Sequence, residues 1–396
     1  MILREHYLKK IRPFYDSDLI KVITGIRRCG KSVILSQIHD ELEQMSKKTV
    51  YLDFDVITVR RKYPDALSLT TYIESLVPEQ DMLYVFLDEI QNVADWNQAV
   101  RTLRLEHCSV FISGSNSRLL SGEFTKELSG RYVSFRIRPF VYKEAQEYMG
   151  QLGRNYSISD YLVWGGFPVA LAQPDIDSRK LYLNDLNNTI IYNDIENRHD
   201  IRKKGIFEKM VDFVLLSNSR IFSAQSISRY LLGQNVTISV PTVTKYLGYL
   251  EEAYVINQVS MYSTKAKEKL NYYIKLYDED VSFNSIRQDD RHYDITHNLE
   301  NIVLNELYYM DYDVTVMNDK KHEIDFRASK NGQVYLIQVA YSVVDDKTYE
   351  REMSAFSKID NSNEKILITN DDINYSTTTV RHIRLPEFLA MNDLSQ

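Results

Sequence analysis

The chain has 396 residues, of which 44% are hydrophobic and 26% are charged, values typical of a folded globular protein. This length exceeds one simple core and predicts about two to four domains. A formal net charge of −7 excludes a general attraction to nucleic acid, so any such contact requires a local basic patch.

The cysteine content and the lengths of the apolar runs indicate the cellular compartment of the protein. Only two cysteines, Cys29 and Cys108, are present, so no disulfide framework is expected. The N-terminus carries charges and lacks an apolar run long enough for a signal peptide, and the longest apolar runs elsewhere are strand-length. We therefore predict a cytoplasmic protein with no membrane partner.

A glycine-rich loop between a strand and a helix is the strongest signal in the chain. The apolar residues Val22 and Ile23 run into Gly25-Ile26-Arg27-Arg28-Cys29-Gly30-Lys31-Ser32, which a helical pattern follows. The two glycines let the backbone curl so that successive N–H groups point at phosphates, and the helix adds its positive end. Lys31 supplies a mobile charge and the Ser32 hydroxyl a ligand for Mg²⁺. The loop predicts nucleotide binding.

Two adjacent acids follow the buried strand that we expect at residues 83–87. A carboxylate at a strand end can hold Mg²⁺, and the next one can orient and polarise an attacking water. We assign Asp88 to the metal and Glu89 to the water. Paired acids are common after strands, and their position downstream of a phosphate loop makes this pair informative.

Further candidates lie around the next two strands. Ser115 and Asn116 follow the apolar strand at 109–113 and could reach the γ-phosphate or the attacking water, although simple turn chemistry also explains them. Arg131 precedes a strand at 132–137 and could stabilise transition-state charge, although lone arginines are mostly structural. The alternation of strands and helices to residue 140 predicts an α/β fold with a parallel sheet, whose ligands bind at the carboxyl ends of the strands.

Four of these motifs together resemble the AAA+-type ATPases of bacteria and archaea: the phosphate loop with its double arginine, Asp88-Glu89-Ile90-Gln91, Ser113-Gly114-Ser115 and Ser129-Gly130-Arg131. The resemblance implies that ATP is the nucleotide, that an arginine acts across a subunit interface and that the chain can form homo-oligomers. The expected nucleotide contacts are Gly25, Arg28, Gly30, Lys31, Ser32, Val33, Ser115 and Asn116, with Lys31, Glu89 and Arg131 as catalytic residues and Ser32 and Asp88 on the metal.

The resemblance extends over the whole chain and gives four predicted domains. An ATPase core covers residues 1–156 and a helical lid covers 157–205. Within the lid, one amphipathic helix is expected at 181–198, and the charges at 194–204 are interpreted as a solvated face and linker.

Residues 206–280 show three helical patterns and a hairpin, which is typical of a winged helix. Ser239 is expected to cap the third helix, whose exposed residues include Thr244 and Lys245. Lysines 265, 267 and 269 lie at the hairpin tip, where each could neutralise one phosphate. The unit could bind DNA, or it could contact protein or pack on the ATPase core, and the sequence leaves these alternatives open.

Residues 281–396 resemble the restriction-endonuclease-like, PD-(D/E)xK fold. Such sites need an acid at the end of one strand and an acid-x-Lys on the next, to bind Mg²⁺ and activate water. Asp325 matches the first acid, but Gln338 and Ala340 occupy the positions of the second acid and the lysine. We therefore predict an inactive nuclease-like domain. Glu300, Glu323 and Asp325 could still bind a cation, although surface carboxylates are the commoner explanation.

The sequence thus predicts a Mg²⁺-dependent ATPase that couples ATP binding and hydrolysis to rearrangement of its C-terminal half. One alternative is an ATP-controlled DNA-binding or regulatory switch with little turnover. An active nuclease is disfavoured because Gln338 and Ala340 replace the second acid and the lysine.

Overall fold

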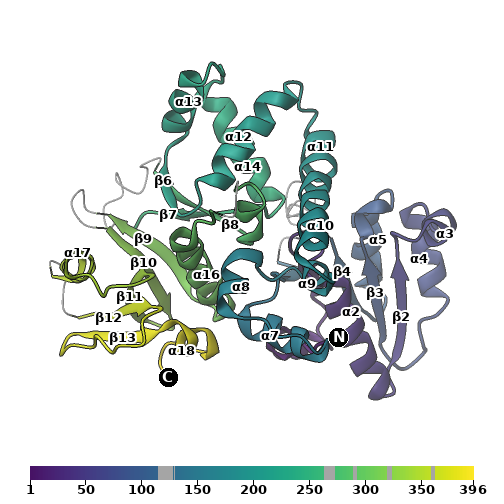
Figure 1. Cartoon of the computed structure of the whole chain (residues 1–396). Coiled ribbons are helices and arrows are strands. Elements are labelled where there is room, and N and C mark those ends of the chain that lie inside the picture. Colours follow the sequence, from purple (N-terminus) through teal and green to yellow (C-terminus); the bar gives the residue numbers. More distant parts are fainter. Residues whose placement is uncertain (115–127, 129, 263–272, 289–291, 319–322, 358–361) are drawn as a thin grey trace. The chain divides into compact units, whose positions relative to one another are not determined.

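The computed structural model describes residues 1–396 except for 115–127, 129, 263–272, 289–291, 319–322 and 358–361 (Figure 1). The described residues form two compact units. The N-terminal unit comprises Met1–Pro139 and Glu252–Tyr254, and the C-terminal unit comprises Phe140–Glu251 and Val255–Gln396. Each unit has its own sheets and its own buried apolar residues.

The N-terminal unit is built on a sheet of five parallel strands in the order β2-β3-β4-β1-β5. This is the parallel sheet that the alternation of strands and helices predicts. The strands are β1 (Ile20–Thr24), β2 (Lys48–Asp53), β3 (Leu83–Asp88), β4 (Cys108–Ser113) and β5 (Tyr132–Arg136). The described helices are α1 (Glu5–Ile11), α2 (Lys31–Gln44), α3 (Ile57–Lys62), α4 (Ala66–Glu74) and α5 (Trp96–Leu103), with 3-10 turns at Arg12–Phe14 and Ile90–Asn92.

Helices cover both faces of this sheet. Alternate residues of the central strands, such as Val22 and Val85, pack in one buried cluster with apolar residues of α4 and α5. On the other face the rings of Tyr51, Phe86 and Phe111 stack, with centroids 5.9 and 4.7 Å apart. His39 of α2 packs edge-on against Tyr51 and Phe86, so α2 covers this face. All residues of β1, β3 and β4 are buried, and most are apolar, as expected for parallel strands covered on both faces. The buried polar side chains of Lys21 and Ser109 bond each other at 2.8 Å.

The C-terminal unit begins with helices and continues into two sheets. The helices are α7 (Tyr142–Gln151), α8 (Ile158–Trp164), α9 (Pro168–Ala172), α10 (Ile176–Thr189), α11 (Asn197–His199), α12 (Lys204–Leu216), α13 (Ala224–Gly233), α14 (Val240–Glu252), α15 (Ser282–Ser285), α16 (Ile295–Tyr309), α17 (Asp346–Phe356) and α18 (Leu385–Ala390), with a π-helix at Ile190–Glu196. The strands are β6 (Arg220–Phe222), β7 (Ile256–Ser260), β8 (Ile274–Asp278), β9 (Asp313–Asn318), β10 (Glu323–Lys330), β11 (Gln333–Ala340), β12 (Glu364–Thr369) and β13 (Val380–Arg384).

The first sheet of this unit has three antiparallel strands in the order β6-β8-β7. Along the chain its elements follow the order α12, β6, α13, α14, β7, β8. Ser239 accepts a hydrogen bond from the N–H of Thr242, as expected of a residue that caps α14.

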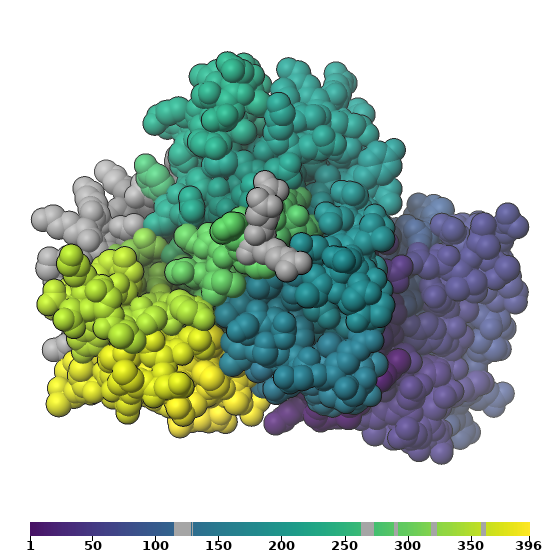
Figure 2. Space-filling model, in the orientation of Figure 1, coloured from purple at the N-terminus to yellow at the C-terminus, as the bar shows by residue number. Residues whose placement is uncertain are grey.

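The second sheet has five strands in the order β13-β12-β11-β10-β9. Strands β9, β10 and β11 are antiparallel, whereas β11, β12 and β13 are parallel. The helix α16 packs against β9, β10 and β11, and α17 connects β11 to β12. In the space-filling view the yellow C-terminal residues and the yellow-green residues before them form one continuous surface (Figure 2).

Two local predictions are wrong. The helix expected at 181–198 is interrupted by the π-helix, and Asp194 and Glu196 are buried, with 2% and 3% exposure, instead of lying on a solvated face. Glu196 pairs with Lys204 at 3.1 Å, which offsets part of the cost of its burial.

Candidate functional site

The loop between β1 and α2 curls because glycine occupies its two strained positions. Gly25 has φ of 141°, and a Cβ atom there would lie 2.0 Å from the carbonyl oxygen of Ile137. Gly30 has φ of 104° and directly precedes α2. Arg28 also has a positive φ, of 66°, and its side chain is exposed. The backbone therefore adopts a tight turn that ends at a helix N-terminus, the geometry that binds phosphate.

The ammonium of Lys31 lies inside this loop. It donates to the carbonyl oxygens of Gly25 and Ile26, each at 3.1 Å, and the residue is only 5% exposed. Ser32, in the first turn of α2, is exposed, and Val33 is half-buried. The loop thus holds one buried cation beside an accessible hydroxyl.

Arg4, near the N-terminus, forms hydrogen bonds that hold the loop in place, a contact that the sequence does not predict. Nη1 of Arg4 donates to the carbonyl oxygens of Cys29 at 3.1 Å and Arg138 at 3.0 Å. Arg4 is 2% exposed. A lone arginine in an N-terminal helix pattern carries no sequence signal for this contact.

Asp88 ends β3 and is held by two hydroxyl groups. The Tyr51 hydroxyl donates to Oδ2 at 3.0 Å, and the Ser113 hydroxyl donates to Oδ1. Ser113 is the last residue of β4, next to β3 in the sheet. Because these bonds fix both carboxylate oxygens, Asp88 has a defined orientation at the carboxyl edge of the sheet.

Glu89 follows directly and has a left-handed backbone, with φ of 51°. Its N–H donates to Oγ of Ser113 at 3.0 Å, so Ser113 contacts both acids, and Gln91 donates to its Oε2. Burial raises the pKa of Glu89, whereas the Lys31 ammonium lowers it. The lysine of the loop therefore acts electrostatically on the predicted base.

The structure brings together some of the predicted residues. Lys31 lies beyond the carboxyl end of β1, Asp88 ends β3 and Glu89 follows it, and Ser113, which bonds both acids, ends β4 between these two strands. Ser115 and Asn116 lie outside the described residues. Arg131 lies at the opposite edge of the sheet, because it precedes β5 and its carbonyl accepts the N–H of Ile20, the first residue of β1. Within one chain, Arg131 is therefore not brought to the acids.

The residues at this edge of the sheet fit a nucleoside triphosphate with Mg²⁺. Among the described residues the hydrogen-bond acceptors of the buried Lys31 ammonium are neutral carbonyl groups, so a phosphate would be a stronger acceptor. Asp88 and the exposed Ser32 supply the hard oxygen ligands that Mg²⁺ prefers.

A second constellation of charged groups lies in the C-terminal unit. Lys275 of β8 places its ammonium 2.7 Å from Glu300 of α16, 2.6 Å from Glu323 and 3.3 Å from Asp325 of β10. The side chains of Lys275, Glu300 and Asp325 are 4%, 12% and 10% exposed. The expectation that these acids are ordinary surface carboxylates is therefore wrong for Glu300 and Asp325, which are largely buried beside a lysine, whereas Glu323 is 36% exposed.

The acids of this cluster are firmly oriented. The Tyr277 hydroxyl donates to Oε1 of Glu300 at 2.5 Å, and the N–H of Val339 donates to Oδ2 of Asp325 at 2.9 Å. Burial, reinforced by the neighbouring Asp325 carboxylate, raises the pKa of Glu300 to about 8. Burial alone would lower the pKa of Lys275, but the three carboxylates raise it above its ordinary value. Lys275 therefore remains an ammonium.

Lys275 is a residue that the sequence analysis missed. Its signal is the charged residue within the apolar run Ile274-Lys275-Leu276, which indicates a buried charge with partners elsewhere. Those partners lie 25 to 50 residues further along the chain, so spacing alone cannot identify them.

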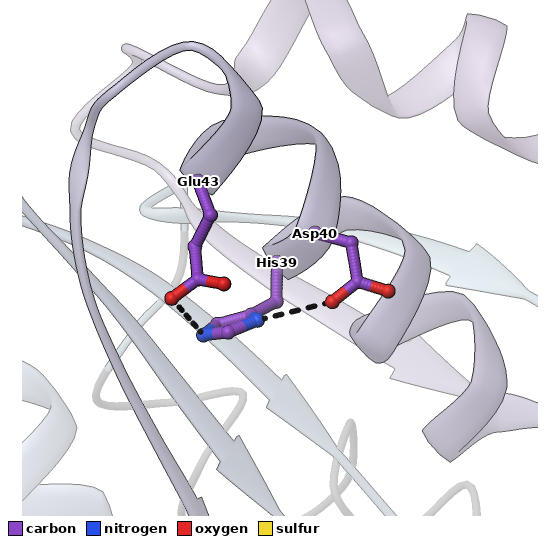
Figure 3. Close-up of side chains that lie close together, drawn as sticks. All are labelled: His39, Asp40 and Glu43. Carbon is purple, nitrogen blue, oxygen red and sulfur yellow. Dashed lines mark hydrogen bonds and ion pairs between the residues drawn. The ribbon is translucent and has the colours of Figure 1, made fainter.

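His39, Asp40 and Glu43 form a small group on α2 whose ligand atoms lie within 4.8 Å of one another (Figure 3). Nδ1 of His39 is 3.4 Å from Asp40 and Nε2 is 3.6 Å from Glu43. Both carboxylates are exposed, and Thr49 lies 3.1 Å from Nε2. These contacts satisfy the imidazole, so packing and surface pairing explain the group.

Comparisons with known proteins agree with the geometry of the N-terminal unit. Residues 17–146 match the family model described as AAA domain, and residues 155–286 match a Domain of unknown function (DUF8612). The N-terminal unit is thus an AAA-type domain with a P-loop, and the predicted α/β fold with a parallel P-loop core is confirmed. The additional C-terminal sheet is also present.

An uncharacterized protein of Haemophilus influenzae is 32% identical over 380 residues, covering 93% of each chain, and the present chain belongs to the same family. An uncharacterized protein of Methanocaldococcus jannaschii is 29% identical over 374 residues, covering 89% of this chain and 82% of that one. Among solved structures, the Walker-type ATPase of Pyrococcus abyssi is similar, with 15% identity, a TM-score of 0.49 and coverage of 73% of this chain and 96% of that chain. In the part of the chain that the structure describes, no helix is both long and apolar enough to span a membrane.

Proposed function

We propose that this protein is a Mg²⁺-dependent ATPase whose nucleotide state controls the arrangement of its C-terminal half. The observation that carries the proposal is the single edge of the parallel sheet that gathers the Lys31 ammonium and the Asp88 and Glu89 carboxylates, with Ser113 bonded to both acids. In this proposal residues 1–156 are the ATPase core, 157–205 a lid, 206–280 a winged helix and 281–396 a nuclease-like domain.

The residues divide the chemistry among them. Backbone N–H groups of the loop between Gly25 and Gly30 bind the phosphates, and Lys31 exchanges its carbonyl partners for phosphate oxygens. When bound, Mg²⁺ supplies positive charge to the β- and γ-phosphates. Asp88 and Ser32 hold the metal, directly or through its waters. Glu89 orients the attacking water and polarises its O–H bond, a function that burial supports by raising the carboxylate's basicity.

Arg131 acts across a subunit interface in this proposal. Its position at the amino end of β5 keeps it from the acids of its own chain, so only a neighbouring chain could receive its guanidinium. Turnover per chain should then rise steeply with protein concentration. Mixing Arg131→Ala chains with Glu89→Gln chains should restore part of the activity. At an interface where the Glu89→Gln chain supplies its intact Arg131 to the site of an Arg131→Ala chain, that site has both an arginine and an intact Glu89.

ATP turnover of two variants tests the central proposal. Lys31→Ala should remove nucleotide binding, whereas Glu89→Gln should bind ATP and lower turnover by about 10²-fold or more. Lys48→Ala, which changes an exposed lysine at the start of β2, is the matched control and should retain wild-type turnover. Wild-type turnover in Glu89→Gln would refute the assignment of the base.

A DNA-binding switch is the second candidate, favoured by the C-terminal unit's first sheet. The order α12, β6, α13, α14, β7, β8 supports this candidate because it is the order expected of a winged helix, and α14 exposes Thr244 and Lys245. The wing lysines 265, 267 and 269 lie outside the described residues. Fluorescence anisotropy with labelled duplex DNA should show affinity that depends on ATP and falls as salt rises. Absence of binding at low salt, with and without ATP, would exclude this function.

A further inference from the structure

Arg4 places a buried cation next to the phosphate loop of the N-terminal unit. Only 2% of the residue is exposed, and its guanidinium lies over the ring of Tyr7, 4.6 Å from the centroid. Nη1 donates to the carbonyl oxygen of Cys29 in the loop and to that of Arg138, which follows β5. Because a guanidinium keeps its charge in proteins, a permanent positive charge is fixed beside the loop.

The backbone around Arg4 holds its side chain in place. The N–H of Arg4 donates to Oε1 of Gln37 on α2 at 3.3 Å, and Nε2 of Gln37 donates to the carbonyl oxygen of Ile2 at 2.6 Å. The carbonyl oxygen of Arg4 accepts the N–H groups of Tyr7 at 3.0 Å and Leu8 at 3.2 Å, at the start of α1. The N-terminus therefore lies beside α2, the helix that begins at the loop (Figure 1).

The carbonyl group that accepts the hydrogen bond in the loop belongs to the peptide that joins Cys29 to Gly30. This peptide is planar and trans, so its C=O and N–H point in opposite directions. Since the carbonyl faces Arg4, the N–H of Gly30 faces the other side of the loop. Gly30 is the N-cap of α2, a position whose backbone N–H groups favour anions. A hydrogen bond to the carbonyl also polarises the N–H of the same peptide, which makes it a stronger donor.

The loop packs on a backbone segment that Arg4 also contacts. The N–H of Ile137 donates to the carbonyl oxygen of Thr24 at 2.8 Å, and the Ile137 carbonyl accepts the Cys29 thiol at 3.2 Å. Arg138 comes next, and its carbonyl oxygen lies 3.0 Å from Nη1 of Arg4. One guanidinium nitrogen therefore joins the loop to the end of β5 and fixes the orientation of the loop peptide relative to the sheet.

We infer that Arg4 is a positioning residue of the nucleotide site, which orients and polarises the Cys29–Gly30 peptide so that the Gly30 N–H donates to a phosphate oxygen. This role rests on the proposed function, because it requires that the loop bind a nucleotide. Arg4 acts through the peptide and needs no contact with the phosphate. The N-terminal segment is then part of the nucleotide site, although it lies outside the strand–loop–helix motif.

Nuclear magnetic resonance can observe this one peptide in the full chain. Cys29–Gly30 is the only Cys-Gly pair in the sequence, so labelling with ¹³C′-cysteine and ¹⁵N-glycine gives a single carbonyl–amide correlation. In the wild type, adenosine 5′-(β,γ-imido)triphosphate with Mg²⁺ should move the Gly30 amide proton downfield. In Arg4→Met the Cys29 carbonyl carbon should move upfield, because it loses a hydrogen bond, and the nucleotide should move the Gly30 proton by less.

Nucleotide affinity gives a second readout. Arg4→Met should weaken binding of the fluorescent analogue mant-ATP by about 10- to 30-fold. Turnover at saturating ATP should fall by less, because the phosphate is bound in the ground state and the transition state alike. Arg4→Lys keeps the charge and should have an intermediate affinity. The control is Arg12→Met: Arg12 pairs with Glu5 and, at 2.7 Å, with Glu41 of α2, so affinity and the Cys29–Gly30 correlation should not change.

The possible results separate this role from the proposed function. Circular dichroism shows which variants fold, and Arg4→Lys decides if Arg4→Met does not. If the wild type binds no nucleotide, the proposed function and the role of Arg4 both fail. If it binds nucleotide and the folded Arg4 variants bind equally well, only the role of Arg4 is refuted. A loss of affinity with an unchanged Cys29–Gly30 correlation would also refute it, as would nucleotide binding by the wild type without a downfield shift of Gly30.

Discussion

The two charged sites of this protein bury their lysines in opposite ways. In the N-terminal unit the Lys31 ammonium rests on two neutral carbonyl groups of its own loop, five and six residues away. In the C-terminal unit the Lys275 ammonium rests on three carboxylates from two other elements, up to 50 residues away. The first lysine is free to exchange its partners for a ligand, whereas the second also stabilises the fold.

Replacing each lysine by methionine tests this contrast and should give the largest effect. Lys275→Met leaves buried carboxylates without their cation and should destabilise the C-terminal unit by about 3–5 kcal/mol. Lys31→Met removes hydrogen bonds to carbonyl groups only and should change stability by about 1 kcal/mol or less, although it abolishes ATP binding. Urea unfolding followed by hydrogen exchange in β8 and β10 measures the difference.

Acid should reduce the effect of Lys275→Met. The penalty arises from ionised Glu300 and Asp325, and burial raises the pKa of both. As the pH falls, these carboxyl groups take up protons and the missing cation matters less. An effect that stays constant from pH 8 to pH 5 would contradict the charge-based explanation.

Gly25→Ala tests whether the backbone conformation of the phosphate loop requires glycine at position 25. The new Cβ would lie 2.0 Å from a backbone oxygen and φ is positive, so we expect a loss of about 3 kcal/mol and of ATP binding. Gly332→Ala is the control in the C-terminal unit. Gly332 also has a positive φ, of 83°, but nothing lies within 4 Å of its Cβ position, so a loss of about 1–2 kcal/mol is expected. Thermal unfolding and binding of a fluorescent ATP analogue distinguish the two variants.

Glu306→Gln tests another buried acid of the C-terminal unit, to which no cation donates a hydrogen bond among the residues that the structure describes. Glu306 accepts the N–H of Tyr142 at 3.2 Å, and burial raises its pKa to about 8. Between the ordinary glutamate pKa and this value the folded chain binds more protons than the unfolded chain, so stability falls as pH rises. The glutamine keeps an acceptor without the charge and should stabilise the protein by about 1–3 kcal/mol at pH 9, and by less at pH 5.

The control for this variant is Glu350→Gln, because Glu350 is an exposed glutamate of the same unit. It should unfold like the wild type at both pH values. Equal stabilisation by Glu306→Gln at pH 5 and pH 9 would show that better packing, and not loss of the buried charge, is responsible.

The sequence predicts a site well where neighbouring residues form it. The spacing of Gly25, Gly30 and Lys31 requires one particular turn, and Asp88 and Glu89 follow a strand whose apolar run is unmistakable. Much of the order of elements was predictable for the same reason, because the apolar periods are local, but β6, β13 and α18 were not predicted. Contacts formed by the tertiary fold were not predictable. The π-helix that buries Asp194 is one example, and the position of Lys275 among acids of α16 and β10 is another.

Ser113 is a further contact that the sequence does not predict, although it lies in the better-predicted site. Its replacement should have the smallest effect of the variants considered. The sequence directs attention to Ser115 and Asn116, yet the residue bonded to both acids is the last one of β4 itself. Ser113→Ala should leave the fold and ATP binding intact but loosen Asp88 and Glu89, which lowers turnover by about tenfold. Ser109→Ala is a demanding control: Ser109 is a buried serine of the same strand that bonds Lys21 and Tyr15, not the acids. If both serine variants lower turnover equally while binding ATP normally, Ser113 affects activity through the strand and not through the two carboxylates.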